Sequence, residues 1–220
     1  MTRKKILEII EQGEGLNVEF KQRFSSHEKV AKEMLAFANT KGGVIVFGID
    51  DDKSIYGVES EKEESELIKE AAEKYCEPPL RYSIKILNIE DKEIVIAEIP
   101  ESQNKPHRLQ DYKNEIDLNT AAVYIRINDK SVLASKEMIK IFQTQEKNIE
   151  LKKYEIGIVE KLIFEYLENN ETITVDELKK FANISYRRAS RALIKLVRAN
   201  ALFIHTKDNG EDYFSSLNLG

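Results

Sequence analysis

The chain has 220 residues, of which 41% are hydrophobic and 33% charged, and its formal net charge is −5 at pH 7. This composition is that of a globular chain and not of a disordered one, and the length is enough to bury a core. A single cysteine and three histidines exclude an internal disulfide and a Cys/His zinc cluster, which fits a reducing compartment. With no apolar leader and no apolar run of membrane-spanning length, we expect a cytoplasmic protein without a membrane partner.

The first part of the chain alternates short helices and strands. The spacing of apolar residues predicts helices over residues 3–12, 27–39 and 62–76. Residues 16–21 alternate apolar and polar side chains, which is typical of a half-buried strand. Residues 44–49 are continuously apolar, which predicts a central strand covered on both faces.

More strands are predicted before the middle of the chain ends. Residues 54–58 are expected to return as a strand after an Asp-rich turn. Residues 81–88 and 93–99 alternate in polarity and predict a hairpin, whereas 101–119 are polar and irregular. Another strand is expected at 122–127.

A polar, charged segment suggests where the chain divides. Ser135 is expected to cap a helix over 136–146, after which residues 147–153 have the composition of a linker. We therefore predict an N-terminal domain over 1–146 and a C-terminal domain over 154–220.

The C-terminal domain has its own order of elements. Thr174 and Glu177 have capping-box spacing, Ser185 is placed to cap the next helix, and Asp208-Asn209-Gly210 predicts a tight turn. In chain order we expect a helix over 154–168, an extended piece at 172–174, helices over 175–182 and 185–200, and strands at 202–205 and 213–214. This is the order of a winged helix-turn-helix domain.

The predicted helix over 185–200 carries five basic residues and no acidic one. Four of them fall within about 80° of one another at helical spacing, and the opposite side is apolar. A helix that enters a DNA groove needs this division between a core face and a cationic face. The expected nucleic-acid contacts on this helix are Tyr186, Arg187, Arg188, Ser190, Arg191, Lys195 and Arg198, and Lys207 would add a contact from the wing. The alternative is a solvated basic face on a dimerisation module.

Several spaced motifs of the N-terminal domain resemble the Schlafen/AlbA-type DNA-binding domain. They are the E-x4-E-F-K pattern from Glu14 to Lys21, the A-F-A-N-T-x-G-G pattern over 36–43, and the apolar strand that ends in Gly-Ile-Asp-Asp at 48–51. Pro106-His107 and the Tyr-Ile-Arg-Ile run at 124–127 are similar to its later elements. The resemblance covers about residues 10–145 and implies an α+β protein, with a mixed α/β N-terminal domain followed by the winged helix. Bacterial members with this layout are described as transcriptional regulators.

The resemblance also implies a possible catalytic site. Vertebrate Schlafen nucleases use three carboxylates on this scaffold for metal-dependent RNA cleavage, and Glu14, Glu19 and Asp51 match them. Carboxylates can hold Mg²⁺ or Mn²⁺, and Lys21 would share the strand face of Glu19 and could hold a phosphate. The plainer alternatives are an ion pair between Glu19 and Lys21, and a simple turn at 50–52.

The Lys41-Gly42-Gly43 segment lacks the spacing of a Walker A loop, so we expect its glycines to end a helix rather than to bind a nucleotide. His107 lies in a polar segment, where a lone histidine is usually exposed and idle.

Three hypotheses remain open from the sequence. The first is a DNA-binding regulator that acts as a homodimer, with RNA as a possible partner and without a cofactor or an evident small-molecule substrate. The second is a metal-dependent nuclease, and the third is an oligomerisation module that does not bind nucleic acid.

Overall fold

The computed structural model describes residues 2–146 and 156–216. The chain divides into two compact units, residues 1–133 and 134–220. No helix in the described ranges has the length and apolar character needed to cross a membrane.

Unit 1 is built on a mixed four-stranded sheet in the order β1-β2-β5-β4. The strands are β1 (Val18–Lys21), β2 (Gly43–Phe47), β4 (Ser83–Ile89) and β5 (Lys92–Ile99). β1 and β2 are parallel and are connected through helix α2 (His27–Asn39), whereas β5 is antiparallel to both of its neighbours.

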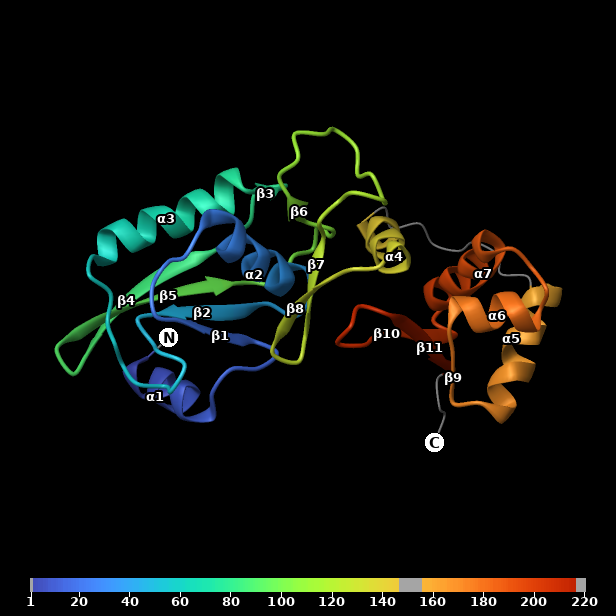
Figure 1. Cartoon of the computed structure of the whole chain (residues 1–220), viewed down its shortest axis with the longest axis horizontal. Helices are drawn as coiled ribbons and strands as arrows, with labels where there is room; N and C mark the ends of the chain where they lie inside the picture. The colour runs from blue at the N-terminus through green and yellow to red at the C-terminus, as the bar shows by residue number, and fades with distance from the viewer. Residues whose placement is uncertain (1, 147–155, 217–220) are drawn as a thin grey trace. The chain divides into compact units, whose positions relative to one another are not determined.

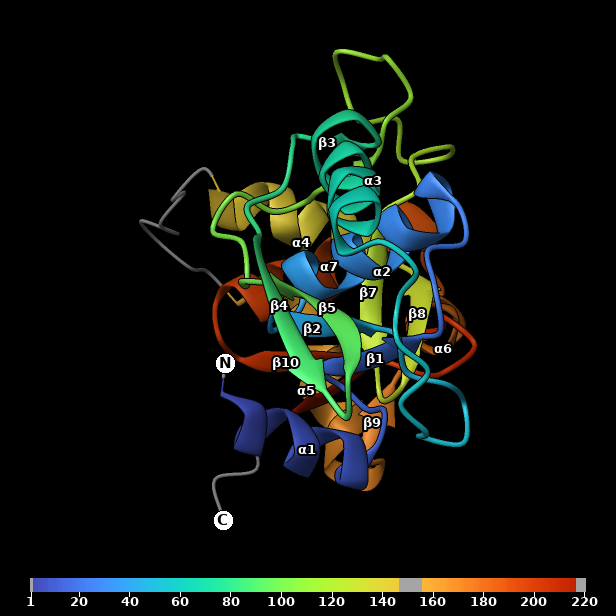
Figure 2. The ribbon, with the colours of Figure 1, turned by 90° about the vertical axis from the view of Figure 1, so that its left-hand side faces the viewer.

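Helices cover both faces of this sheet (Figures 1 and 2). α2 and α3 (Glu61–Lys74) pack on one face, and α1 (Arg3–Gln12) packs on the other. Side chains alternate across the pleat, so Ile45 and Phe47 of β2 join the core under α2 and α3, while Val46 joins the core over α1. The prediction of a central strand covered on both faces is confirmed.

Two small antiparallel sheets complete unit 1. They pair β3 (Cys76–Glu77) with β6 (Arg108–Leu109), and β7 (Tyr124–Ile127) with β8 (Lys130–Leu133). The sequence pattern did not predict β3, β6 or β8, because each is short and is held by pairing with another segment. Cys76 lies in β3 and not in the helix predicted over 62–76, since α3 ends at Lys74.

The predicted strand at residues 54–58 is wrong. This segment makes only one isolated bridge, between Ile49 and Ile55. Gly48 and Gly57 have φ values of 95° and 86°, so the backbone turns at both points. The Gly48 carbonyl accepts hydrogen bonds from the amides of Tyr56 and Gly57, which closes a loop instead of extending a strand.

Unit 2 combines four helices with a small sheet in the order β10-β11-β9, as far as the structure describes this unit. The helices are α4 (Lys136–Glu146), α5 (Ile158–Asn169), α6 (Val175–Phe181) and α7 (Tyr186–Arg198), and the strands are β9 (Thr172–Ile173), β10 (Leu202–Thr206) and β11 (Asp212–Ser216).

Local hydrogen bonds fix where the helices of unit 2 begin. Thr174 and Glu177 form the predicted capping box, with the Glu177 amide 3.2 Å from Thr174 Oγ1 and the Thr174 amide 2.7 Å from Glu177 Oε2. The hydroxyl of Ser185 accepts from the Arg188 amide at 3.3 Å and caps α7. Buried side chains of α5, α6 and α7 share one core with Phe214 of β11.

α4 belongs to unit 2, so the division falls about one helix earlier than the boundary expected from composition. The Ser190 hydroxyl of α7 donates to Glu137 Oε1 of α4 at 2.6 Å, and this contact joins the two helices. Composition cannot show this, because the polar segment that follows a helix does not reveal which domain the helix packs on. The expected linker at 147–153 lies outside the described residues.

Candidate functional sites

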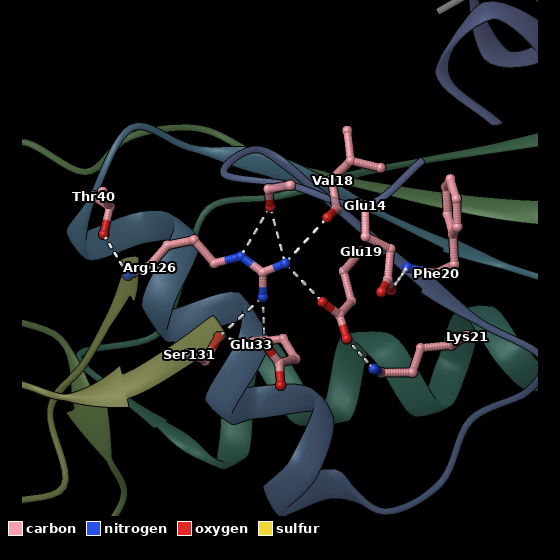
Figure 3. A network of polar contacts seen from close by, with 10 residues as sticks. Glu14, Val18, Glu19, Phe20, Lys21, Glu33, Thr40, Arg126 and Ser131 are labelled. Carbon is pink, nitrogen blue, oxygen red and sulfur yellow. Dashed lines mark hydrogen bonds and ion pairs between the residues drawn. The ribbon is translucent and has the colours of Figure 1, made fainter. Parts of the chain in front are cut away.

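Arg126 of β7 is the centre of a buried polar network in unit 1 (Figure 3). The residue is 2% exposed, and its Cζ lies 5.0 Å from the centre of the Phe37 ring. Its guanidinium donates to Glu19 Oε2 at 2.8 Å and to Glu33 Oε2 at 3.0 Å, so two carboxylates compensate one buried charge. The remaining acceptors are the carbonyl oxygens of Gly15 and Val18 and the hydroxyl of Ser131.

Both carboxylate oxygens of Glu19 are engaged. Oε2 accepts from Arg126, and Oε1 accepts from the ammonium of Lys21 on the same face of β1. Glu19 is 8% exposed, so these contacts replace the water that its charge would otherwise require. The alternative of an ion pair between Glu19 and Lys21 is thus the arrangement in the structure, and Lys21, expected to hold a phosphate, instead bonds to Glu19.

The other two candidate carboxylates do not join Glu19 in a metal site. Oε1 of Glu14 accepts a hydrogen bond from the Phe20 amide at 2.8 Å, and Asp51 is exposed in the turn that follows β2. In the ranges that the structure describes, no three His, Cys, Asp or Glu side chains are grouped so that they could hold a metal ion. In this arrangement Glu14, Glu19 and Asp51 do not fit a shared Mg²⁺ or Mn²⁺ ion.

Asn39 of α2 joins three of the sequence motifs through hydrogen bonds. It belongs to the Ala-Phe-Ala-Asn motif and bonds to the backbone of the Pro-His and Tyr-Ile-Arg motifs. Its Nδ2 donates to the carbonyls of His107 and Tyr124 at 2.8 and 2.9 Å, and its Oδ1 accepts from the His107 amide. His107 is 4% exposed, and its ring nitrogens lie 2.8 Å from the Pro78 carbonyl and 2.6 Å from Ser102 Oγ. The expectation of an exposed, idle His107 is wrong, because the residue holds the loop onto α2.

Gly42 and Gly43, which follow α2, allow neighbouring atoms to approach the backbone closely. A Cβ on Gly42 would lie 2.7 Å from the Glu101 amide nitrogen, and a Cβ on Gly43 would lie 2.4 Å from the Phe37 ring. The Gly42 amide is bonded to the Phe37 carbonyl at 2.8 Å. This agrees with the prediction that these glycines end the helix.

α7 presents an open cationic surface in unit 2. Arg187, Arg188 and Arg191 are exposed, and none has a side-chain hydrogen bond or ion pair within the described part of the chain. Tyr186 beside them is 44% exposed. On the opposite side, Ala189, Leu193 and Leu196 are fully buried in the core. The helix thus has the two faces that its sequence predicts.

Two of the predicted contact residues on α7 are placed differently. Ser190 is 1% exposed and is bonded to Glu137, so it cannot reach a ligand on the surface, and that prediction is corrected. Lys195 forms an ion pair with Glu160 of α5 at 3.0 Å. Burial alone would raise the pKa of Glu160, but the hydrogen bond from Lys195 and further bonds hold that pKa below its usual value. The cationic surface is therefore concentrated in the first two turns of α7.

A hollow borders this surface, and two other predicted contact residues lie elsewhere in unit 2. Arg188 and Arg191 line a hollow of about 310 Å³ together with residues 157–160 of the first turn of α5. At the hairpin between β10 and β11, Lys207 is exposed and its Nζ lies 3.6 Å from Glu211 Oε2, an ion pair that is weak at a solvated surface. Arg198, near the end of α7, is only half-buried.

The family model described as Schlafen, AlbA_2 matches residues 14–135 of the chain. The chain belongs to this family. The match contains every member of the Arg126 network and the Asn39 contacts, so these interactions lie within the Schlafen, AlbA_2 domain.

Two solved structures are similar to parts of this Schlafen, AlbA_2 protein. One is the N-terminal domain of a RecG-related protein from Nitrosomonas europaea, with 19% identity, a TM-score of 0.39, and coverage of 51% of this chain and 79% of that one. The other is the DIP2311 protein from Corynebacterium diphtheriae, with 11% identity and a TM-score of 0.44. That match covers 65% of this chain, which spans only 32% of the DIP2311 chain.

The residue that sequence reasoning missed in the Schlafen, AlbA_2 domain is Arg126. Its Tyr-Ile-Arg segment was identified, but an arginine on a short strand is expected to face solvent. The sequence did contain one signal for this burial. Glu19 and Arg126 have opposite charges and lie in separate motifs of one domain, and buried charges need such partners. Glu33 carries no comparable signal, because it lies among other charged residues on α2.

Proposed function

We propose that the protein is a DNA-binding transcriptional regulator, in which unit 2 acts as a winged helix-turn-helix and places α7 in the major groove. The observation that carries the proposal is the open cationic surface at the start of α7. Arg187, Arg188 and Arg191 are exposed without partners in the described residues, on a helix whose other side is buried. Exposed arginines at the N-terminal end of a recognition helix can contact both base edges and phosphates.

The order of elements supports this proposal. α5, β9, α6 and α7 are followed by the β10–β11 hairpin, and β9 adds to that hairpin as a third strand. In such a domain α6 and α7 form the helix-turn-helix and the hairpin forms the wing. Lys207 at the hairpin would then contact the DNA backbone.

The hollow beside α7 supplies a second contact. Arg188 and Arg191 line it together with the first turn of α5. A phosphate group lying there would meet two guanidinium groups, which favour bidentate contacts, beside the ion pair of Glu160 and Lys195 that also lines the hollow.

We further propose that the regulator is a homodimer. One helix reads only a few base pairs, and two copies related by a two-fold axis would read a palindromic site with enough specificity for regulation. The Schlafen, AlbA_2 domain would contribute dimerisation or further nucleic-acid contacts.

Salt-dependent binding to duplex DNA tests the proposal. The change is the double substitution Arg187→Ala/Arg191→Ala in the full chain. Each phosphate contact adds about 0.9 to the slope of log K against log salt, so the slope should become shallower by about 2. Affinity should fall by about fivefold or more for each arginine, since such contacts are worth about 1–3 kcal/mol.

Lys161→Ala is the matched control, because Lys161 is an exposed cation on α5 outside the α7 surface. It should change neither the slope nor the affinity by a comparable amount. If wild-type protein binds no duplex DNA, or if both variants weaken binding equally, the proposal is wrong. A protein that forms dimers but binds no DNA would instead be an oligomerisation module.

A further inference from the structure

A serine and a histidine of unit 1 are hydrogen-bonded to each other in a way that the proposed function does not use. Nε2 of His107 lies 2.6 Å from Ser102 Oγ, and Nδ1 lies 2.8 Å from the carbonyl oxygen of Pro78. Because a carbonyl oxygen only accepts hydrogen bonds, Nδ1 carries the proton of the neutral ring, and the Ser102 hydroxyl donates to Nε2. A serine nucleophile needs this bonding, and the carbonyl takes the orienting place that an aspartate has in a Ser-His-Asp triad.

The backbone of both residues is fixed to the end of α2. The Ser102 amide donates to the carbonyl of Ala38 at 2.8 Å, and the His107 amide donates to Oδ1 of Asn39 at 2.8 Å. Nδ2 of Asn39 also donates to the His107 carbonyl at 2.8 Å. A buried helix thus supports the serine and the histidine together, which keeps their side chains at bonding distance.

The two side chains differ in their access to solvent. His107 is 4% exposed, whereas Ser102 is partly exposed. Both residues line a hollow of about 220 Å³ in unit 1. A small molecule that enters this hollow would meet the Ser102 hydroxyl, while the ring that takes up the proton stays shielded from water.

The size and charge of the hollow limit what it can hold. Sites for drug-sized molecules have about 300–1,000 Å³, so a hollow of about 220 Å³ suits a smaller group. Its lining contains one cation, Arg81, and one anion, Glu101, which is also paired with Lys105 at 2.7 Å. Since neither sign of charge dominates the lining, the hollow fits a small uncharged group better than a phosphate or a polyanion.

A hydrogen-bond donor for a developing negative charge is also available. Attack on an ester places charge on the carbonyl oxygen, and the amide of the residue after the nucleophile often stabilises it. That residue is Gln103, which lines the same hollow and whose amide makes no hydrogen bond within the described ranges. The Asn104 amide donates to Ser102 Oγ at 3.0 Å and would stabilise this oxygen as its proton leaves.

We propose that Ser102 and His107 are the catalytic residues of an esterase site for esters of small, uncharged acyl groups. Ser102 Oγ bonds to the acyl carbon while its proton moves to Nε2 of His107. The bond between the acyl carbon and the alcohol oxygen then breaks, and Nε2 gives the proton to the departing alcohol. Water cleaves the acyl-serine by the same route, which releases the acid and restores both residues. This activity lies in unit 1 and does not depend on the proposed DNA contact.

Covalent labelling of the full chain with a small alkyl fluorophosphonate tests the proposal. The oxygen of an activated serine bonds to phosphorus and fluoride leaves, whereas an ordinary hydroxyl is too weak a nucleophile to react. We expect mass spectrometry of the wild-type protein to find the label on Ser102. This result needs no variant, so it does not depend on how well a substituted chain folds.

Ser215 of unit 2 is the matched control within the same chain. It is partly exposed, and its Oγ lies 2.9 Å from Nε2 of His205. No hydrogen bond holds Nδ1 of His205 among the described residues, so this histidine lacks the orienting carbonyl. Ser215 should therefore react about tenfold more slowly than Ser102, or not at all.

Hydrolysis of nitrophenyl acetate measures turnover at the same site. Ser102→Ala should lower the rate about tenfold or more, whereas Ser215→Ala should leave it unchanged. Nitrophenyl octanoate should be cleaved more slowly than the acetate by the wild-type protein, because its acyl chain is too long for the hollow. Far-UV circular dichroism shows whether each variant is folded.

Three results would overturn the proposal. These are an unlabelled Ser102, labelling of Ser215 as fast as that of Ser102, or equal hydrolysis by the wild type and folded Ser102→Ala. The contact between Ser102 and His107 would then only fix the loop. Duplex DNA binding should be unchanged in Ser102→Ala, so failure here and failure of the regulator proposal can be told apart.

Discussion

Replacing Arg126 should destabilise unit 1 more than almost any other single substitution of a charged residue. Arg126→Met keeps the aliphatic stem and removes the guanidinium that bonds to Glu19 and Glu33. Both carboxylates are largely buried, with side-chain exposures of 10% and 13%. They would lose their compensating charge, and the Gly15 carbonyl would lose its two donors.

The magnitude follows from these contacts. Removing one partner of a buried ion pair costs about 3–5 kcal/mol, because an uncompensated charge stays buried. Lys21 still bonds to Glu19, and the Ser131 hydroxyl still bonds to Glu33, which reduces the penalty at each carboxylate. We therefore expect a loss of about 3 kcal/mol in the free energy of unfolding of unit 1, a large part of the stability of a typical domain.

Urea unfolding followed by far-UV circular dichroism measures this loss, and hydrogen exchange at β1 and α2 assigns it to unit 1. The control is Arg23→Met, because Arg23 is exposed and its replacement should change stability by less than about 0.5 kcal/mol. The triple variant Arg126→Met/Glu19→Gln/Glu33→Gln should recover part of the loss, since the stranded charges are removed. Equal stabilities of Arg126→Met and Arg23→Met would refute the reasoning.

Three further predictions concern buried polar groups. Burial raises the pKa of Asp212 despite hydrogen bonds from Ser135 and Thr206, so the folded state favours the protonated acid. Stability therefore falls as the pH rises from the ordinary carboxyl pKa of the unfolded chain through the raised pKa of the folded state. Asp212→Asn should therefore raise Tm more at pH 8 than at pH 4, and an equal gain at both pH values would contradict this. Asn39→Ala removes three buried hydrogen bonds and should cost about 2–4 kcal/mol in urea unfolding, whereas a cost below about 1 kcal/mol would show that the Asn39 contacts contribute little. Ser190→Ala should cost about 1 kcal/mol of stability through the lost bond to Glu137 but leave duplex affinity unchanged, and a loss of affinity at unchanged stability would restore Ser190 as a contact residue.

Much of the fold follows from local patterns in the sequence. The bounds of α1 and α2 agree with the predicted ranges of 3–12 and 27–39, because apolar spacing and flanking caps or glycines determine both ends. The capping box of α6 is likewise a local signal within four residues. By contrast, β6 and β8 depend on pairing partners that local patterns do not reveal.

The candidate sites were predicted in part. The exposure of Arg187 and Arg191 follows from helical spacing, because the opposite side of α7 is apolar. The burial of Ser190 does not, since it depends on α4 packing against this helix. In unit 1 the motif residues were identified, but their role was not, because Glu19 and Arg126 meet only through the fold.

The most direct test of the regulator proposal is the chemical reactivity of individual arginines with and without duplex DNA. Phenylglyoxal modification of the full chain, read by mass spectrometry, reports each guanidinium separately. We predict that duplex DNA protects Arg187, Arg188 and Arg191, while exposed Arg23 in unit 1 reacts as before. If DNA binds and the three α7 arginines remain as reactive as in the free protein, α7 is not the recognition helix.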